Sequence, residues 1–242
     1  AVNECSFEIE SGSITGLIGP NGAGKTTLFN MIAGLFPPDS GRIEFYGRDV
    51  TGLPAHQLFH LGIVRTFQIP HEFARMTVLD NLALVPAGQS GENLFAAWFG
   101  GGRVRRQESR IRRQAEEVLD FLNLRALRDE KAGNLSGGQK KLLELGRTMM
   151  TEPRLVLLDE PAAGVNRTLL GTLNEAIVRL NRERGYTFCI VEHDMDMVTR
   201  LCDPVIVMAE GTVLTQGRMD EIMRNPQVLE AYMGSTAHEE PA

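Results

Sequence analysis

The sequence has few cysteines and no long apolar run, and each shortage excludes a class of protein. Its three cysteines, Cys5, Cys189 and Cys202, lack the spacing of a metal site or a disulfide framework, which suits reduced thiols in the cytosol. No apolar run reaches the ~20 residues needed to cross a bilayer, and no signal peptide is visible at the start. The net charge of −6 argues against a general nucleic-acid binder.

What is present is typical of a globular protein that can bury a sizeable core: 242 residues, 43% hydrophobic and 23% charged. The most informative stretch is a glycine-rich loop. Its residues are Gly19, Pro20, Asn21, Gly22, Ala23, Gly24, Lys25 and Thr26. It follows an apolar run (14–18) that predicts a buried strand, and it precedes a predicted helix that begins at Thr27.

This strand–loop–helix order predicts a site for nucleotide phosphates. Backbone N–H groups of the loop and the N-terminus of the helix bind phosphate oxygens. Lys25 would reach the β- and γ-phosphates, and Thr26 would hold Mg²⁺ through its hydroxyl group. Thr27 adjoins the loop and is a further candidate for nucleotide binding. A glycine-rich turn after a strand is the alternative interpretation.

A second polar segment begins a predicted helix further along the chain. Ser136 is placed as its N-cap, and Gly137, Gly138 and Gln139 form its first turn. The two glycines leave the neighbouring amide groups uncovered, so they could contact a ligand. An ordinary capped helix is the alternative.

Two carboxylates end a third segment, a predicted buried strand that begins at Arg154. Asp159 could bind Mg²⁺ through water, and Glu160 could orient and deprotonate an attacking water molecule. The alternative is a polar strand end with two solvated acids.

Together these segments resemble the ATP-binding subunit of an ABC transporter, whose signature is matched by 135–139 without substitution. Two further family positions follow in order, Gln68 after Val64-Arg65-Thr66-Phe67 and His193 after Cys189-Ile190-Val191-Glu192. The resemblance implies that Gln68 touches Mg²⁺ and the water and senses the membrane partner, and that His193 contacts the γ-phosphate. Taken singly, they would be a loop glutamine and a capping or core histidine.

The resemblance covers about residues 2–234. With the alternation of apolar strands and helices, it implies an α/β fold: a P-loop NTPase parallel sheet with an inserted helical subdomain and a partial N-terminal antiparallel β region. We expect a single ABC ATPase domain in four parts. These are the first half of the nucleotide-binding core (1–67), the helical insertion ending in the signature (68–140), the second half of the core (141–215), and C-terminal helices and a frayed tail (216–242).

Two features depart from the family pattern. The sequence begins inside an apolar segment, Val2 to Ile9, that we interpret as the family's second strand. We therefore expect the first strand, with the aromatic residue that stacks on adenine, to be missing from the sequence given. Asn166 stands where most members have an aspartate that bridges the two nucleotide sites. Asparagine keeps the hydrogen-bonding shape without the charge, and the amino-acid importers share it.

Several stretches, including 160–166, 191–198 and 225–234, resemble importers of branched-chain amino acids. Of their two related ATPase subunits, the chain resembles the one with the longer middle segment. The resemblance implies transmembrane permease subunits and a second ATPase subunit, identical or related, as partners. A periplasmic or extracellular binding protein would act indirectly, and no nucleic acid is implied. The expected location is peripheral, at the cytoplasmic face of the inner or plasma membrane.

Other functions remain as alternatives. Urea importers and the ATPase of lipopolysaccharide export are neighbours in sequence. A soluble ABC ATPase of DNA repair or translation would usually carry long coiled-coil insertions or a second cassette, and neither is present. An ATP-driven clamp that binds without hydrolysis is disfavoured because Glu160 and His193 are intact.

The insertion itself contains three surface candidates. Six arginines gather at 103–113, either as a solvated helix face or as a contact for anionic lipid head groups. Trp98 and its apolar neighbours form either a docking patch or a local core cluster. Phe73 and Met76 could receive a short helix of the membrane subunit, or they could pack inside the insertion.

Overall fold

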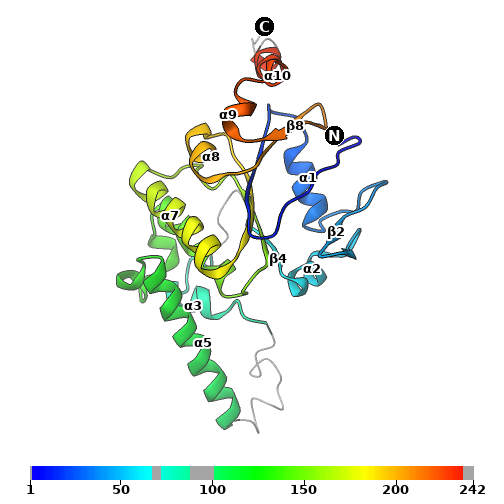
Figure 1. Ribbon diagram of the computed structural model, residues 1–242. Coiled ribbons are helices and arrows are strands. Elements are labelled where there is room, and N and C mark those ends of the chain that lie inside the picture. Colours follow the sequence, from blue (N-terminus) through cyan, green and yellow to red (C-terminus); the bar gives the residue numbers. More distant parts are fainter. Residues whose placement is uncertain (1, 67–71, 88–100, 237–242) are drawn as a thin grey trace. The chain divides into compact units, whose positions relative to one another are not determined.

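The computed structural model describes residues 2–66, 72–87 and 101–236, apart from the side chains of 101, 103 and 234–236 (Figure 1). The chain divides into two compact units. The first comprises Ala1–Gln68, Arg154–Ala163 and Ile177–Ala242, and the second comprises Ile69–Pro153 and Gly164–Ala176. The four-part division expected from the sequence has other boundaries and stays a prediction.

The first unit is built on a six-stranded sheet in the order β4-β5-β6-β1-β7-β8. Its strands are β4 (Ile63–Arg65), β5 (Leu155–Asp159), β6 (Thr187–Val191), β1 (Ile14–Ile18), β7 (Val205–Ala209) and β8 (Thr212–Gly217). All neighbours pair in parallel except β8, which is antiparallel to β7. Strands β1, β5 and β6 are buried along their whole length. Their mostly apolar sequences are typical of strands that are covered on both faces.

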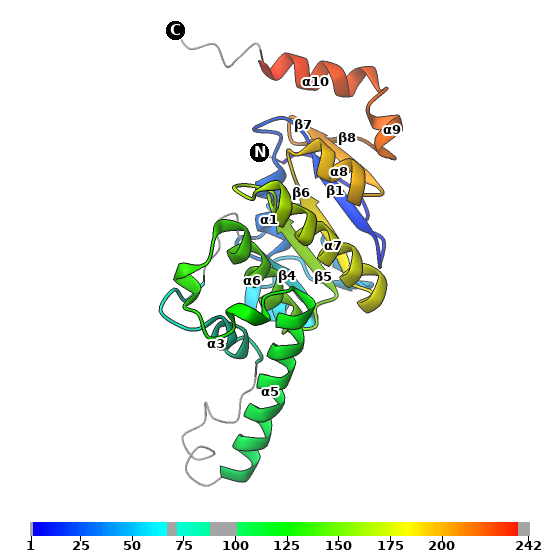
Figure 2. The same cartoon turned by 90° about the vertical axis from the view of Figure 1, so that its left-hand side faces the viewer.

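Helices cover both faces of this sheet, with α1 and α8 on opposite sides (Figures 1 and 2). The helices of the unit are α1 (Lys25–Ile32), α2 (Ala55–Leu61), α8 (Met195–Leu201), α9 (Met219–Ile222) and α10 (Pro226–Thr236), together with the second half of α7 (Arg167–Arg184). Alternate residues of β1 face opposite sides of the sheet. Leu17 joins the core cluster that contains Phe29 of α1, whereas a Cβ atom on Gly16 would lie 3.3 Å from Val198 of α8.

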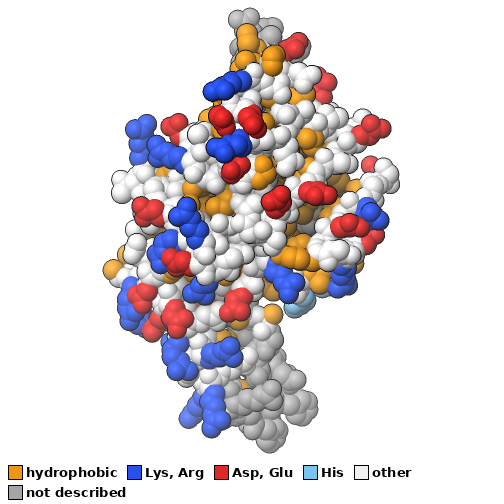
Figure 3. All heavy atoms as spheres, viewed as in Figure 1, with side chains coloured by type: hydrophobic (Ala, Val, Ile, Leu, Met, Phe, Trp, Pro, Cys, Tyr) orange, Lys and Arg blue, Asp and Glu red, His pale blue; other side chains and the backbone are white. Residues whose placement is uncertain are grey.

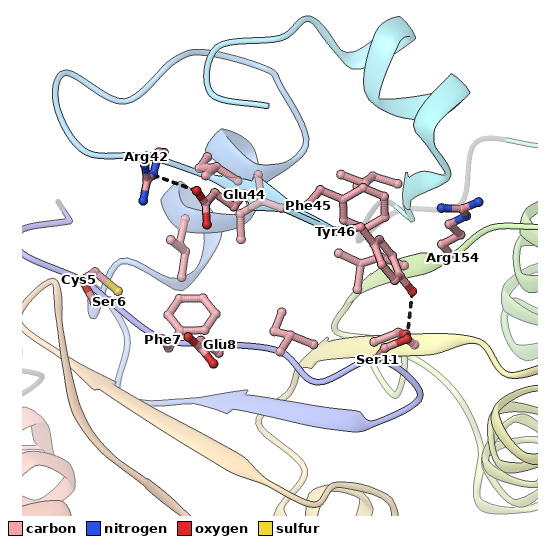
Figure 4. A pocket seen from close by; sticks show the side chains of 17 residues that line it. Cys5, Ser6, Phe7, Glu8, Ser11, Arg42, Glu44, Phe45, Tyr46 and Arg154 are labelled. Carbon is pink, nitrogen blue, oxygen red and sulfur yellow. Dashed lines mark hydrogen bonds and ion pairs between the residues drawn. The ribbon is translucent and has the colours of Figure 1, made fainter. Parts of the chain in front are cut away.

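The prediction of a strand from Val2 to Ile9 is wrong. No strand is present between residues 2 and 13. The sequence also predicts a strand over 42–46, of which only β2 (Glu44–Phe45) is observed, in a hairpin with β3 (Arg48–Asp49). A cavity of about 700 Å³ is lined by both the N-terminal segment and the hairpin (Figure 4). A strand requires a hydrogen-bonded neighbour, so the apolar alternation of 2–9 does not suffice to make one.

The described part of the second unit contains helices and no strand. They are α3 (Val78–Ala83), α5 (Gly101–Phe121), η2 (Arg125–Leu127), η3 (Ala132–Asn134), α6 (Gly137–Met149) and the first half of α7. The helical spacing of Ile111, Ala115, Val118, Leu119 and Leu122 predicts a buried helix face, and the structure confirms it, because all five residues are buried. Helix α6 approaches α3 and α5 closely at Gly146, where a Cβ atom would lie 3.1 Å from both Leu82 and Val118.

The arginine-rich stretch lies on α5, where side chains of Lys and Arg gather in Figure 3. Arg106, Arg110 and Arg113 are exposed, and their spacing places them on one face of the helix. The choice between a solvated face and a lipid contact stays open. The predictions for Trp98 and its neighbours fall outside the described residues. Among the helices that are described, none has the length and apolar character that crossing a bilayer requires.

Candidate nucleotide and hydrolysis site

The candidate residues of the first unit follow three adjacent parallel strands. In the register of the sheet, Val191 of β6 pairs with Leu17 of β1 on one side and with Asp159 of β5 on the other. The carboxyl ends of parallel strands meet at one edge of a sheet, where α/β proteins bind their ligands. The glycine-rich loop, the two acids after β5 and the histidine after β6 therefore share one edge.

The phosphate loop, residues 19–26, is shaped by a close approach of its backbone to β7. Gly19 has φ +151°, and a Cβ atom there would lie 2.1 Å from the carbonyl oxygen of Met208. No other residue fits at this position. Gly24, in the left-handed region at φ 99°, precedes the first turn of α1, which carries no acidic residue. The first turn of the helix therefore offers free N–H groups and a positive dipole end, as an anion site requires.

Lys25 is 6% exposed and folds back over the loop. Its ammonium group donates hydrogen bonds to the carbonyl oxygens of Gly19 at 2.7 Å and of Pro20 at 3.0 Å. Burial lowers the pKa of Lys25, and the negative charges of Glu160 and Asp159 oppose that shift. The ammonium group is therefore within electrostatic reach of both carboxylates. The side chains of Asn21 and Thr26 are exposed.

Asp159, 5% exposed, makes a contact that sequence reasoning missed. Arg65 on β4 donates a hydrogen bond of 2.8 Å to its Oδ2 atom, and the exposed fractions of the two side chains are 9% and 7%. The same guanidinium group donates to Asn30 of α1 and lies 5.9 Å from the ring centre of Phe29. A charged residue within a short apolar strand was the available signal for Arg65.

The carboxylate of Asp159 fits the predicted Mg²⁺ site. Arg65 engages Oδ2 and no described group bonds to Oδ1, so one oxygen is available beside the loop. A carboxylate with the Thr26 hydroxyl is the oxygen donor set that Mg²⁺ takes together with phosphates and water. Across the described residues there is no cluster of three or more His, Cys, Asp or Glu that could hold a metal alone. Gln68, the third predicted ligand, lies outside the described residues.

Glu160 and His193 face each other across the ends of β5 and β6. The Oε1 atom of Glu160 lies 3.3 Å from the Nε2 atom of His193. Glu160 has φ 47°, an unusual backbone conformation of the kind that concentrates at functional sites. Its N–H group donates to the carbonyl oxygen of Val191 at 2.9 Å, which fixes its position relative to β6.

The signature segment belongs to the second unit and starts α6. The predicted N-cap is confirmed as a capping box, in which the Oγ atom of Ser136 accepts from the Gln139 N–H group and the Gln139 side chain accepts from Ser136. Gly138 has a steric requirement, since a Cβ atom there would lie 2.6 Å from Leu169 of α7. Ser136 and Gly137 are exposed at the start of the helix.

A strand, a phosphate loop and a helix, with acids at the end of another parallel strand of the same sheet, define the P-loop class of nucleotide-binding proteins. Residues 2–163 match the family described as ABC transporter, and residues 212–238 match a branched-chain amino acid ATP-binding cassette transporter family. The chain belongs to the ABC transporter family and is an ATPase.

Individual relatives cover nearly the whole chain. A probable branched-chain amino acid transport ATP-binding protein LivG of Archaeoglobus fulgidus is 45% identical over 97% of this chain and 90% of its own length. The high-affinity LivG of Escherichia coli K12 is 38% identical, over 97% and 92% of the two chains. A crystal structure of an ATP-binding cassette of an ABC transporter in its ADP conformation has a TM-score of 0.81 at 38% identity, covering 97% of this chain and 92% of the other.

Proposed function

We propose that this chain is the ATP-hydrolysing subunit of an importer of branched-chain amino acids. The observation that carries the proposal is the agreement of two matches. Relatives at 38–45% identity over 97% of the chain are named as branched-chain amino acid transport ATP-binding proteins, and residues 212–238 match the corresponding C-terminal family. The second match favours amino acids over urea or lipopolysaccharide as the substrate.

The phosphate loop binds the triphosphate of ATP. Its N–H groups and the first turn of α1 contact the phosphate oxygens, and Lys25 exchanges the carbonyl oxygens of Gly19 and Pro20 for the β- and γ-phosphates. Thr26, Asp159 and Gln68 hold Mg²⁺. A Mg²⁺ ion held by these residues would supply positive charge that stabilises the charge developing during phosphoryl transfer.

Glu160 and His193 carry the hydrolytic step. Glu160 accepts a proton from the attacking water, and His193 contacts the γ-phosphate. The 3.3 Å separation of their side chains supports a shared position beside that phosphate. Because Lys25 lies within electrostatic reach of Glu160, the same edge combines the charge that binds the phosphate with the base that activates water.

A second ATPase subunit completes the site in this proposal. By family resemblance, Ser136, Gly137, Gly138 and Gln139 of one subunit contact the γ-phosphate held by Lys25 of the other. The exposed start of α6 supports this, since its first-turn N–H groups form an anion site. ATP would then join the two subunits, and hydrolysis would release them.

Light scattering of Glu160→Gln with ATP, alone and with a related ATPase subunit, tests the shared site. We expect a dimer that Ser136→Arg abolishes, whereas Ser11→Arg, at an exposed serine of the first unit, leaves it intact. If the protein stays monomeric under all nucleotide conditions and keeps full ATPase activity, the shared site is wrong.

The membrane partner docks next to Phe73. This ring is 51% exposed, and its backbone is held by the buried amide of Asn81, which accepts from the Phe73 N–H at 2.8 Å and donates to its carbonyl at 3.1 Å. An exposed aromatic ring on a fixed backbone is suited to bind an apolar helix. Met76 is half-buried and contributes less surface.

The docking segment is connected to the signature helix by two contacts within the second unit. Glu72 forms an ion pair of 2.7 Å with Lys140, and the guanidinium group of Arg147 lies 5.6 Å from the ring centre of Phe73. Both cations belong to α6, which begins with the signature. A displacement of Phe73 by the membrane subunit would therefore be transmitted to Ser136.

Transport measurements on Phe73→Asp test the docking surface. We expect basal ATPase of the isolated subunit to persist, while substrate-stimulated ATPase and uptake in the assembled transporter are lost. Tyr46→Asp, at a 59% exposed aromatic residue of the first unit, is the matched control and should transport normally. If the folded Phe73 variant transports normally, the docking surface lies elsewhere.

The location and the substrate follow from the partners. The chain would be peripheral, at the cytoplasmic face of the membrane, held there by permease subunits. Co-purification with those subunits and identification of the ligand on the associated binding protein test the substrate. A ligand other than leucine, isoleucine or valine would contradict the amino-acid assignment.

A further inference from the structure

Glu192, the residue after β6, is a buried carboxylate whose partners are all backbone N–H groups. Its exposed fraction is 3%. The Oε1 atom accepts a hydrogen bond from Ala162 at 2.6 Å, and the Oε2 atom accepts from His193 at 2.9 Å and from Asp194 at 3.1 Å. No lysine or arginine of the described chain pairs with it. Three charge-assisted bonds therefore replace the hydration of this side chain.

These bonds join the two segments just beyond their last backbone hydrogen bond, which the Glu160 N–H group donates to Val191. The last registered pair of β5 and β6 is Asp159 with Val191. Beyond it, Ala162 continues the segment that carries Glu160, and Glu192 continues the segment that carries His193. Ala162 is also two residues before Gly164, where the chain enters the second unit. Glu192 thus fixes both sides of the facing pair.

A purely structural role for Glu192 would be to stabilise the turn into α8. That turn already has its own cap, because the Oδ1 atom of Asp194 accepts from the Met197 N–H at 2.9 Å. The bond from Ala162 adds nothing to the helix, and at 2.6 Å it is the shortest of the three. Its effect is confined to the spacing between the two segments.

We propose that Glu192 is a positioning residue for ATP hydrolysis, which sets the separation of Glu160 and His193 by anchoring Ala162. The inference rests on the roles given to Glu160 and His193 in the proposed function. Glu192 touches neither the nucleotide nor the water. It acts on the rate of hydrolysis and leaves the phosphate loop, and hence ATP binding, unchanged.

Glu192→Gln tests the anchor with a minimal change of shape. Glutamine offers one acceptor oxygen and an NH₂ group that can only donate, so it cannot accept on both sides. The orientation that keeps the bonds from His193 and Asp194 points the NH₂ group at the Ala162 N–H group. We expect the Ala162 link alone to be lost.

The matched control is Asp194→Asn, which changes a carboxylate in the same loop to an amide but keeps a good N-cap. For Glu192→Gln we expect kcat to fall about 10- to 100-fold while KM for ATP changes less than about twofold, because misplaced catalytic groups slow chemistry without altering binding. Asp194→Asn should change both by less than about twofold. The amide proton of Ala162 should shift upfield in the NMR spectrum of Glu192→Gln and stay unchanged in the control.

Each outcome decides between the alternatives. If kcat of Glu192→Gln is normal although the Ala162 amide proton has shifted, the positioning role is wrong. If kcat of Asp194→Asn falls as much as that of Glu192→Gln, Glu192 only stabilises the turn. Glu160→Gln is measured alongside, since its retention of activity would refute the proposed function and not the anchor specifically. If Glu192→Gln does not fold, Glu192→Asp keeps the charge but is one methylene too short to reach Ala162, and the same kcat loss is expected.

Discussion

The phosphate loop and the catalytic edge, the latter formed by Asp159, Glu160 and His193, lie at the same end of the sheet but are held in place differently. The loop is fixed by contacts with backbone carbonyl groups: Gly19 fits against the carbonyl oxygen of Met208 on β7, and Lys25 bonds to carbonyl groups five and six residues earlier. The catalytic edge is fixed by buried side chains from distant parts of the chain. Arg65 holds Asp159, and Glu192 holds the segment after Glu160.

This difference has an energetic consequence. A loop that depends on its backbone tolerates changes nearby, provided that glycine stays where a Cβ atom would collide. An edge that depends on buried charges is sensitive to each partner, because removal of one leaves the other desolvated and unpaired. We therefore expect ATP binding and ATP hydrolysis to respond to different sets of substitutions.

The largest effect is expected for Glu160→Gln, which separates the two regions functionally. Loss of the proposed general base should lower the hydrolysis rate by about 10²- to 10⁴-fold, while ATP binding persists because the loop is unchanged. Phosphate release and equilibrium binding of labelled ATP measure the two quantities. Lys25→Ala is the converse, with loss of nucleotide affinity. Near-normal turnover in Glu160→Gln would place the base elsewhere.

The next largest effect is expected for Arg65→Met, which tests whether the stability of the catalytic edge depends on buried charges. The carboxylate of Asp159 would lose its ion pair, at a cost of about 3–5 kcal/mol in the free energy of unfolding, less whatever Lys25 compensates. Urea unfolding measures it. Arg42→Met removes the exposed pair with Glu44, whose side chains are 66% and 49% exposed, and should cost no more than about 1 kcal/mol.

A double variant sharpens this test. If Arg65 acts through Asp159, adding Asp159→Asn to Arg65→Met should restore part of the lost stability, so that the two changes are not additive. Full additivity would show that Arg65 stabilises the fold through Asn30 and Phe29 alone, and the catalytic edge would then not depend on this ion pair.

Gly19→Ala tests the backbone fit of the phosphate loop without changing any charged residue. The new methyl group would meet the carbonyl oxygen of Met208 at 2.1 Å, so the loop must shift, with a loss of about 1–3 kcal/mol typical of overpacking and a weaker affinity for ATP. Gly22, the site of the control variant Gly22→Ala, also has a positive φ, +81°, but no atom lies within 4 Å of the position of a Cβ atom there. Gly22→Ala should be the milder variant, and equal effects would contradict the steric explanation.

The same contrast explains what the sequence could predict. The loop, the buried strands around it and the apolar face of α5 follow from residues close in sequence. Arg65 and Glu192 were missed because their partners Asp159 and Ala162 are 94 and 30 residues away. Val2–Ile9 was wrongly assigned as a strand because strand formation depends on a neighbour that a local pattern cannot supply. Charged residues within or next to buried strands were the available signal.

The smallest effect is expected at the signature, where two side chains close together in the sequence hold the start of α6 in place. In the capping box, Ser136 and Gln139 satisfy each other's N–H groups three residues apart, which is why the cap could be predicted. Ser136→Ala should destabilise α6 by about 1 kcal/mol, whereas Ser136→Asn, which keeps a cap, should cost less. Urea unfolding of the two variants measures the difference. If Ser136→Asn retains stability but loses ATP-dependent dimerisation, the hydroxyl group serves the nucleotide of the second subunit and not the helix alone.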